Sequence, residues 1–136
     1  MTGPITTLIY AGILGLMLIV LSIRTSLRRR DTRVSLGTGN DAELLRRSRI
    51  QGNFVEFVPF ALILIWMLEF AQFSVWLIHT LGIVLIVARL LHAWALSYGE
   101  GWERFAARAA GILGTYIVIA TGSILALCWA LVGFRF

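Results

Sequence analysis

Three polar side chains follow one another along a single face of the segment at residues 41–70. Arg49, Asn53 and Glu56 fall within about 60° of one another if each residue turns a helix by about 100°. A guanidinium, an amide and a carboxylate on one stripe can together hold a ligand that carries both a carboxylate and an ammonium group. The alternative is structural, in which Glu56 pairs with Arg89 or with another arginine and the stripe only holds helices together.

A second pair of ionisable side chains lies one helical turn apart near the end of the segment at residues 73–96. These are Arg89 and His92, which we expect at the same depth in the membrane as Arg49. They are candidates for the same site, but Arg89 can equally extend to the lipid headgroups and His92 can equally form an interhelical hydrogen bond. His79, nearer the other end of this segment, is expected to serve packing.

Four apolar runs must position these side chains. Of the 136 residues 59% are apolar and only 14% are charged, which is more hydrophobic surface than one small soluble core can hide. A helix that spans a bilayer needs about 20 mainly apolar residues. The expected helices span residues 5–23, 41–70, 73–96 and 106–132. The sequence therefore predicts an all-α, integral membrane four-helix bundle, with the whole chain in a single domain.

The arginines indicate how the bundle is oriented. Arg24 and residues 28–30 follow the first apolar run instead of preceding it, as they would in a secretory signal, so we expect a retained helix. Arg104 and Arg108 lie between the third and fourth runs, whereas the connection at residues 69–74 has no Arg or Lys. The positive-inside rule then predicts cytosolic first and third connections and external termini. This topology accounts for the net charge of +5 without a nucleic-acid partner.

Several residues predict local features of the helices. Asn40 or Asp41 is expected to cap the second helix, and Pro59 is expected to bend it. The last segment carries small residues that let another helix approach closely, namely Ala107, Gly111, Thr115 and Gly122. Cys128 has no disulfide partner and no metal-ligand spacing, so we expect neither a metal site nor a reactive thiol.

These residues together resemble a known family, the membrane-associated proteins in eicosanoid and glutathione metabolism (MAPEG). The shared pattern is Arg49, Gln51, Asn53, Glu56 and Pro59, followed by Ala88-Arg89-Leu90. The length, the four apolar runs and the arginine-rich first connection also fit, and the compact bacterial branch is the most similar. The resemblance implies a homotrimer in a bacterial inner membrane, with glutathione bound between adjacent subunits at the cytosol-facing end.

The resemblance also implies a role for each residue of the pattern. Arg49, Asn53, Glu56 and Arg89 would contact glutathione on one subunit, while Arg30 and Gln51 would do so from its neighbour. An arginine at the start of the fourth helix would stabilise the thiolate, either Arg104 or Arg108 one turn later. The family often has tyrosines where this chain has Phe57, His92 and Leu96, so His92 is a candidate to replace one phenol.

The expected function is that of a membrane-bound glutathione-dependent transferase or peroxidase. A fixed guanidinium favours the thiolate of glutathione, which can attack an apolar electrophile or hydroperoxide that arrives from the bilayer. The alternative is a non-enzymatic protein of the same fold that binds a lipid or glutathione. A small multidrug transporter subunit would need a carboxylate within residues 5–23, where there is none. A purely structural subunit would leave the polar stripe with no purpose beyond helix pairing.

Overall fold

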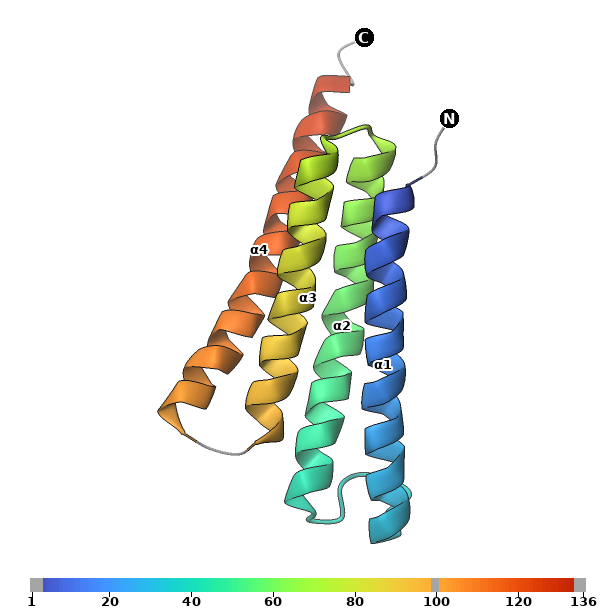
Figure 1. The fold of residues 1–136 in the computed structure, drawn as a ribbon, viewed down its shortest axis with the longest axis vertical. Helices are drawn as coiled ribbons and strands as arrows, with labels where there is room; N and C mark the ends of the chain where they lie inside the picture. Colours follow the sequence, from blue (N-terminus) through green and yellow to red (C-terminus); the bar gives the residue numbers. More distant parts are fainter. Residues whose placement is uncertain (1–3, 99–100, 134–136) are drawn as a thin grey trace.

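The protein folds into four antiparallel helices joined by three short connections. The computed structural model describes residues 4–98 and 101–133. The helices are α1 (Ile5–Thr32), α2 (Ala42–Phe70), α3 (Val75–Ser97) and α4 (Trp102–Gly133), and the described residues contain no strand (Figure 1). Even α3, with 23 residues, spans about 35 Å, more than the hydrocarbon core of a bilayer. The prediction of four membrane-spanning helices is therefore confirmed.

Two helices extend further into the arginine-rich connections than their apolar runs suggest. Helix α1 continues through the arginines at residues 28–30 to Thr32 and ends at Arg33, whose φ of 56° is left-handed. Arginine is a good helix former, so the helix ends only near the first turn-forming residues. Helix α4 begins at Trp102 instead of residue 106. Both candidate thiolate-stabilising arginines are therefore on α4 itself.

The connection between α1 and α2 is held by Asp41, the N-cap of α2. Its side chain accepts a hydrogen bond of 2.6 Å from the backbone N–H of Leu44 and bonds of 2.7 and 3.1 Å from the Arg28 guanidinium. The Arg28 guanidinium and the Leu44 amide together hold the pKa of the Asp41 carboxyl below its ordinary value. Of the two predicted caps, Asp41 is confirmed, while Asn40 has a left-handed φ of 63° in the preceding turn.

At the opposite end of the bundle, a carboxylate ties the start of α1 to the end of α2. Glu69 accepts hydrogen bonds of 2.8 and 2.7 Å from the backbone N–H groups of Thr6 and Thr7, which have no partner within their own helix. One turn further along α1, the Tyr10 hydroxyl lies 2.7 Å from His79 Nδ1 on α3. The prediction that His79 serves packing is therefore confirmed.

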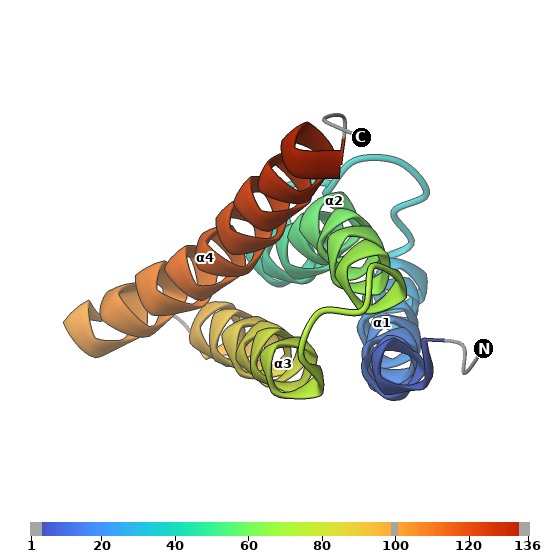
Figure 2. The same cartoon turned by 90° about the horizontal axis from the view of Figure 1, so that it is seen from above.

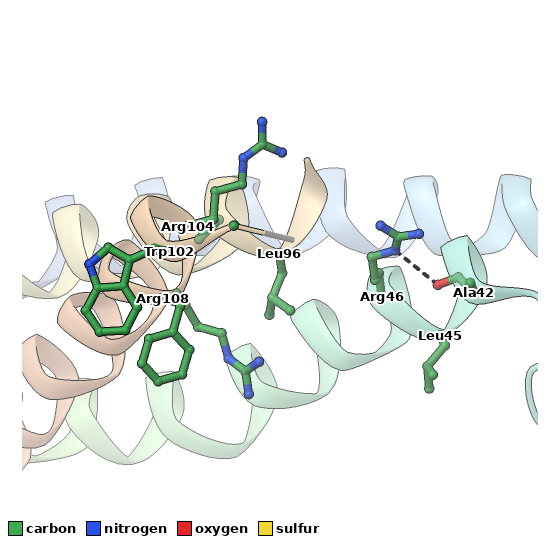
Figure 3. A pocket seen from close by; sticks show the side chains of 10 residues that line it. Ala42, Leu45, Arg46, Leu96, Trp102, Arg104 and Arg108 are labelled. Atoms are coloured by element: carbon green, nitrogen blue, oxygen red, sulfur yellow. Dashed lines mark hydrogen bonds between the residues drawn. The ribbon is translucent and has the colours of Figure 1, made fainter. Parts of the chain in front are cut away.

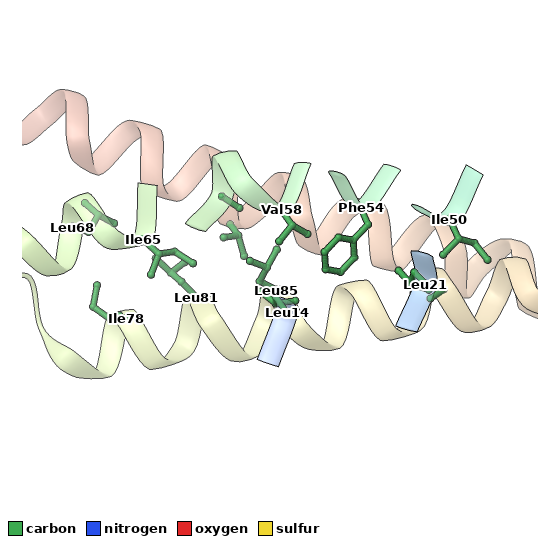
Figure 4. Close-up of a cluster of buried hydrophobic side chains, with 13 residues drawn as sticks. Leu14, Leu21, Ile50, Phe54, Val58, Ile65, Leu68, Ile78, Leu81 and Leu85 are labelled. Carbon is green, nitrogen blue, oxygen red and sulfur yellow. The ribbon is translucent and has the colours of Figure 1, made fainter. Parts of the chain in front are cut away.

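The core lies along the contacts that α2 and α3 make with each other and with the outer helices (Figure 4). Within the described residues α1 and α4 each contact both α2 and α3 but not one another, as the view from above illustrates (Figure 2). Glycines let α4 approach closely, since a Cβ at Gly111 would lie 2.6 Å from the Ala88 carbonyl oxygen, and one at Gly122 would lie 3.0 Å from Leu64 Cβ. The predicted small-residue contact of α4 is thus confirmed at both glycines.

The outer surface of the bundle is apolar. The first turns of α4 diverge from the other three helices. Large aliphatic and aromatic side chains are exposed on all four helices, as expected of a surface that faces lipid. In Figure 1, α4 leans away from the other helices toward its first residues. Helix α2 runs through Pro59 without interruption, and a bend there stays a prediction. The divergence of α4 leaves room for cavities at this end of the bundle.

Candidate functional site

The predicted polar stripe lines a cavity of about 520 Å³ between α2, α3 and α4. The cavity lies at the end of the bundle that carries the α1–α2 and α3–α4 connections. Its walls are Leu45, Ser48, Arg49, Gly52, Asn53 and Glu56 from α2, His92 and Leu96 from α3, and Arg108 and Ile112 from α4. All three residues of the polar stripe on α2 therefore line the same cavity, as their spacing predicts.

The two charged residues of the stripe lack protein partners in the part of the chain that the structure describes. Arg49 and Glu56 are both exposed, and neither forms an ion pair or a side-chain hydrogen bond with a described residue. Glu56 lies near the middle of α2, where an acidic side chain facing hydrocarbon costs about 2.5–3.5 kcal/mol. A ligand, water or another protein chain must therefore cover this carboxylate.

Arg89 is buried within the bundle and joins three helices. Its side chain is only 2% exposed, and it donates hydrogen bonds to Asn53 Oδ1 at 2.8 Å, to the Gly111 carbonyl at 3.1 Å and to the Thr115 hydroxyl. The two structural alternatives for this residue, extension to the headgroups and an ion pair with Glu56, are therefore both wrong. Arg89 does not line the cavity, and it reaches the site through Asn53, whose Oδ1 it holds.

The two arginines of α4 differ in what they face. Arg108 lines the polar cavity together with Glu56, whereas Arg104 lines only a neighbouring cavity nearer the connections. Arg108 also lines that neighbouring cavity (Figure 3) and an apolar groove of about 350 Å³ on the outer face of α4. Arg108 thus lies where a polar cavity and an apolar groove meet.

The remaining candidates divide between the cavity and α1. His92 is 4% exposed, lines the cavity and forms no hydrogen bond with the described residues, contrary to the interhelical bond considered for it. Gln51 faces the other way and donates a 3.0 Å hydrogen bond to Ser22 Oγ of α1. Arg30 lies in the last turn of α1, 3.6 Å from Asp31, and does not line the cavity. Contacts from Arg30 and Gln51 to a neighbouring subunit's ligand stay predictions.

Two residues of the site were not anticipated from the sequence. Ser48 lines the cavity, and its buried hydroxyl oxygen has no hydrogen-bond partner among the described residues. Its position, one turn before Gly52 and two turns before Glu56, is the sequence signal that points to it. In the sequence Thr115 stands out only as a small residue, yet its hydroxyl accepts a hydrogen bond from Arg89 and donates one of 3.0 Å to the Gly111 carbonyl.

The arrangement favours binding of a zwitterion over metal chemistry. The cavity holds one carboxylate and two guanidinium groups, which complement an ammonium group and carboxylate groups respectively. Among the described residues no group of three His, Cys, Asp or Glu side chains is placed to hold a metal ion, and Cys128 is exposed on α4, away from the cavity. The protein itself therefore offers this cavity charges and hydrogen-bond donors but no nucleophilic thiol.

The fold and this site define an integral membrane protein with four spanning helices and a polar cavity between α2, α3 and α4. The chain belongs to the MAPEG family, whose profile matches residues 7–135. It is similar to the inner membrane protein YecN of Escherichia coli K12, with 33% identity over 111 residues that cover 82% of each chain, and equally to YecN of E. coli O6:H1. The family resemblance read from the sequence is thereby confirmed.

Proposed function

We propose that the protein is a membrane-bound glutathione-dependent transferase or peroxidase that acts on apolar electrophiles or hydroperoxides. The observation that carries this proposal is the convergence of Arg49, Glu56 and Arg108 on one cavity. Glutathione has an ammonium group, two carboxylates and a thiol. The Glu56 carboxylate suits the ammonium group, Arg49 suits a carboxylate, and Arg108 is left for the sulfur.

The neighbouring side chains support the same assignment. Because Oδ1 of Asn53 accepts a hydrogen bond from Arg89, its amide N–H groups are left to donate to a ligand carboxylate. Ser48 lines the cavity, and its hydroxyl has no hydrogen-bond partner in the described part of the chain, so it is a further candidate donor for glutathione. In this scheme Arg89 is a positioning residue that orients Asn53, and His92 contacts the ligand from α3.

Arg108 would serve as a fixed positive charge and not as a base. A thiol has an ordinary pKa of about 8.5, and a guanidinium close to the sulfur lowers it, so the thiol proton passes to water. In the transferase reaction the thiolate forms an S–C bond while the leaving group departs with its electron pair. In the peroxidase reaction two glutathione molecules are oxidised to the disulfide, and the hydroperoxide is reduced to an alcohol and water.

The second substrate would approach along the apolar groove on the outer face of α4. Phe105, Ile112, Leu113 and Tyr116 line this groove with Arg108. Arg108 and Ile112 also line the polar cavity, so an apolar molecule dissolved in lipid would reach the guanidinium from a space that adjoins this cavity. The Tyr116 ring packs against Phe57 with ring centroids 5.6 Å apart. Water-soluble and lipid-soluble reactants would then meet at one residue.

The proposal includes assembly and placement in the cell. The exposed Glu56 and Arg49 need cover within the membrane, and a homotrimer would supply it together with Arg30 and Gln51 from a neighbouring subunit. The similarity to YecN, an inner membrane protein by name, favours a bacterial inner membrane. The positive-inside rule favours cytosolic α1–α2 and α3–α4 connections and external termini.

The binding step is tested by calorimetry of glutathione with the detergent-purified protein and two variants. Glu56→Gln should weaken binding by about tenfold or more, because it removes a charge-assisted hydrogen bond worth about 1.5–3 kcal/mol. Glu103→Gln is the matched control, since Glu103 is exposed on the first turn of α4 and outside the cavity. Equal affinities for the two variants, or no binding by the wild type, would refute the glutathione site.

The thiolate step is tested by the ultraviolet absorption of bound glutathione as a function of pH. We expect the wild type to bind thiolate below pH 8, and Arg108→Gln to raise the apparent thiol pKa by at least one unit while glutathione still binds. Arg104→Gln should leave that pKa unchanged. If Arg104→Gln raised the thiol pKa and Arg108→Gln did not, Arg104 would be the residue that stabilises the thiolate.

The second candidate function is a non-enzymatic protein that binds glutathione or a lipid. It is favoured by Phe57 and Leu96, which offer no phenol at positions where the family often has one. In that case wild-type protein binds glutathione, yet bound glutathione remains a thiol at neutral pH and no model electrophile is consumed.

A further inference from the structure

A second cavity, of about 640 Å³, adjoins the candidate site at the end of the bundle that carries the α1–α2 and α3–α4 connections (Figure 3). It lies between the first turns of α2, the last turns of α3 and the first turns of α4. Its walls are Ala42, Leu45, Arg46, Ala95, Leu96, Gly101, Trp102, Arg104, Phe105 and Arg108. Ligand chemistry can be inferred from the charge and polarity of these walls.

The cavity is lined by three guanidinium groups and, among the described residues, by no carboxylate. Arg46 belongs to α2, and Arg104 and Arg108 belong to α4 (Figure 3). Arg46 Nε donates a 3.3 Å hydrogen bond to the Ala42 carbonyl of its own helix, and none of the three arginines forms an ion pair with a described residue. Three like charges around one space favour an anionic occupant.

The two acidic residues nearest to the cavity on α2 and at its N-cap form ion pairs with other arginines. The Asp41 carboxylate lies 2.7 Å from the Arg28 guanidinium, and the Glu43 carboxylate lies 2.7 Å from that of Arg47. Both acids therefore neutralise arginines that do not line the cavity. Among the described residues, no carboxylate forms an ion pair with the three arginines of the cavity.

The other walls indicate that this anion carries hydrocarbon. Leu45 and Leu96 give one side of the cavity an apolar surface. Trp102 and Phe105 on the other side are 80% and 60% exposed, and their rings stack with centroids 5.8 Å apart. Exposed tryptophan at the end of a spanning helix is typical of the headgroup level of a bilayer. Arginine beside such a residue meets lipid phosphate at that depth.

We propose that this cavity binds the phosphate headgroup of an anionic phospholipid, with Arg46 and Arg104 as its main contacts and an acyl chain along Leu45 and Leu96. Neither Arg46 nor Arg104 lines the polar cavity, whereas Leu45, Leu96 and Arg108 line both cavities. The headgroup contacts therefore do not depend on glutathione, and the acyl chain would lie directly beside the polar cavity. A bound lipid would cover the gap where α4 diverges from α3 and would neutralise the arginines that face it. It would also border Arg108, which lines both cavities.

The proposal is tested by native mass spectrometry of the delipidated protein in detergent. Phosphatidylglycerol and phosphatidylcholine with the same acyl chains are titrated separately, and inorganic phosphate is added as a competitor. We expect phosphatidylglycerol to bind at least fivefold more tightly than phosphatidylcholine. Arg46→Gln and Arg104→Gln should each weaken phosphatidylglycerol binding by about fivefold. Arg33→Gln, at the end of α1, removes the same charge outside the cavity and should have little effect.

Each other outcome would overturn the proposal. Equal affinity for the two lipids would mean that the arginines do not select the anionic headgroup. An equal loss in all three variants would mean diffuse attraction to the charged end of the bundle. Displacement of phosphatidylglycerol by millimolar phosphate would identify a site for a free anion. Variant folding is checked by thermal unfolding, and glutathione calorimetry on the same samples tests the polar cavity separately.

Discussion

The planar guanidinium of Arg89 should stabilise the fold through the geometry of its hydrogen bonds more than through its positive charge. It makes three hydrogen bonds, to Asn53, Gly111 and Thr115. Hydrogen bonds within membrane proteins average about 0.6 kcal/mol, and those of charged groups elsewhere are worth about 1.5–3 kcal/mol. Taking about 0.6–1.5 kcal/mol for each of the three bonds, we expect Arg89→Met to lower the free energy of unfolding by about 2–4.5 kcal/mol. Lysine lacks the planar fork, so Arg89→Lys should retain less than half of this contribution.

The assay is reversible unfolding in mixed detergent, with a double-mutant cycle between Arg89→Met and Asn53→Leu. A coupling energy of about 1 kcal/mol is expected for the pair, because the cycle isolates their shared hydrogen bond. Arg89→Met should also weaken glutathione binding in protein that remains folded, since Asn53 loses the bond that orients it. The reasoning is refuted if Arg89→Lys is as stable as the wild type, or if Arg89→Met costs less than about 0.5 kcal/mol.

Two further predictions concern the stability of the bundle, one at a close contact between helices and one at the N-cap of α2. Gly111→Ala should destabilise the protein by about 1–3 kcal/mol, because the new Cβ would lie 2.6 Å from the Ala88 carbonyl oxygen. At Gly12 a new Cβ would meet no neighbouring side chain or helix within 4 Å, so Gly12→Ala should stabilise its helix by about 0.5–1 kcal/mol. Thermal unfolding of both variants checks the contrast. The lowered pKa of Asp41 means that its ion pair with Arg28 stabilises the fold above the unfolded pKa of about 4 and is lost as the pH falls through the folded value. Asp41→Asn keeps a capping side chain, so the wild type should be the more stable protein above pH 5 and the difference should shrink toward pH 3; a constant difference would contradict the assignment.

Much of the fold could be predicted from the sequence, because the bilayer requires helices of about the same length and each helix repeats about every 3.6 residues. Apolar runs of about 20 residues have few structural solutions in lipid, so the four helices and the shared face of Arg49, Asn53 and Glu56 followed from counting. The helix ends did not, because arginine is compatible with both a helix and a loop. Helix α1 therefore continued through its arginines to Thr32.

The pairing of buried polar groups could not be read from the sequence. Nothing in the spacing of Arg89 distinguishes an ion pair with Glu56 from the hydrogen bonds to Asn53 and Thr115, because that choice depends on how α2, α3 and α4 rotate against one another. The same holds for Arg104 and Arg108. They are one turn apart, and only the lean of α4 directs Arg108 alone to the polar cavity.

The central claim is that glutathione binds in the cavity formed by Arg49, Glu56 and Arg108. Its most direct test is a structure of the protein in lipid nanodiscs with saturating glutathione, determined by electron cryomicroscopy. The account predicts density for the tripeptide in this cavity, with its ammonium group at Glu56 and its sulfur closest to Arg108. A cavity filled by lipid or by a neighbouring subunit's side chains, with no tripeptide density, would contradict it.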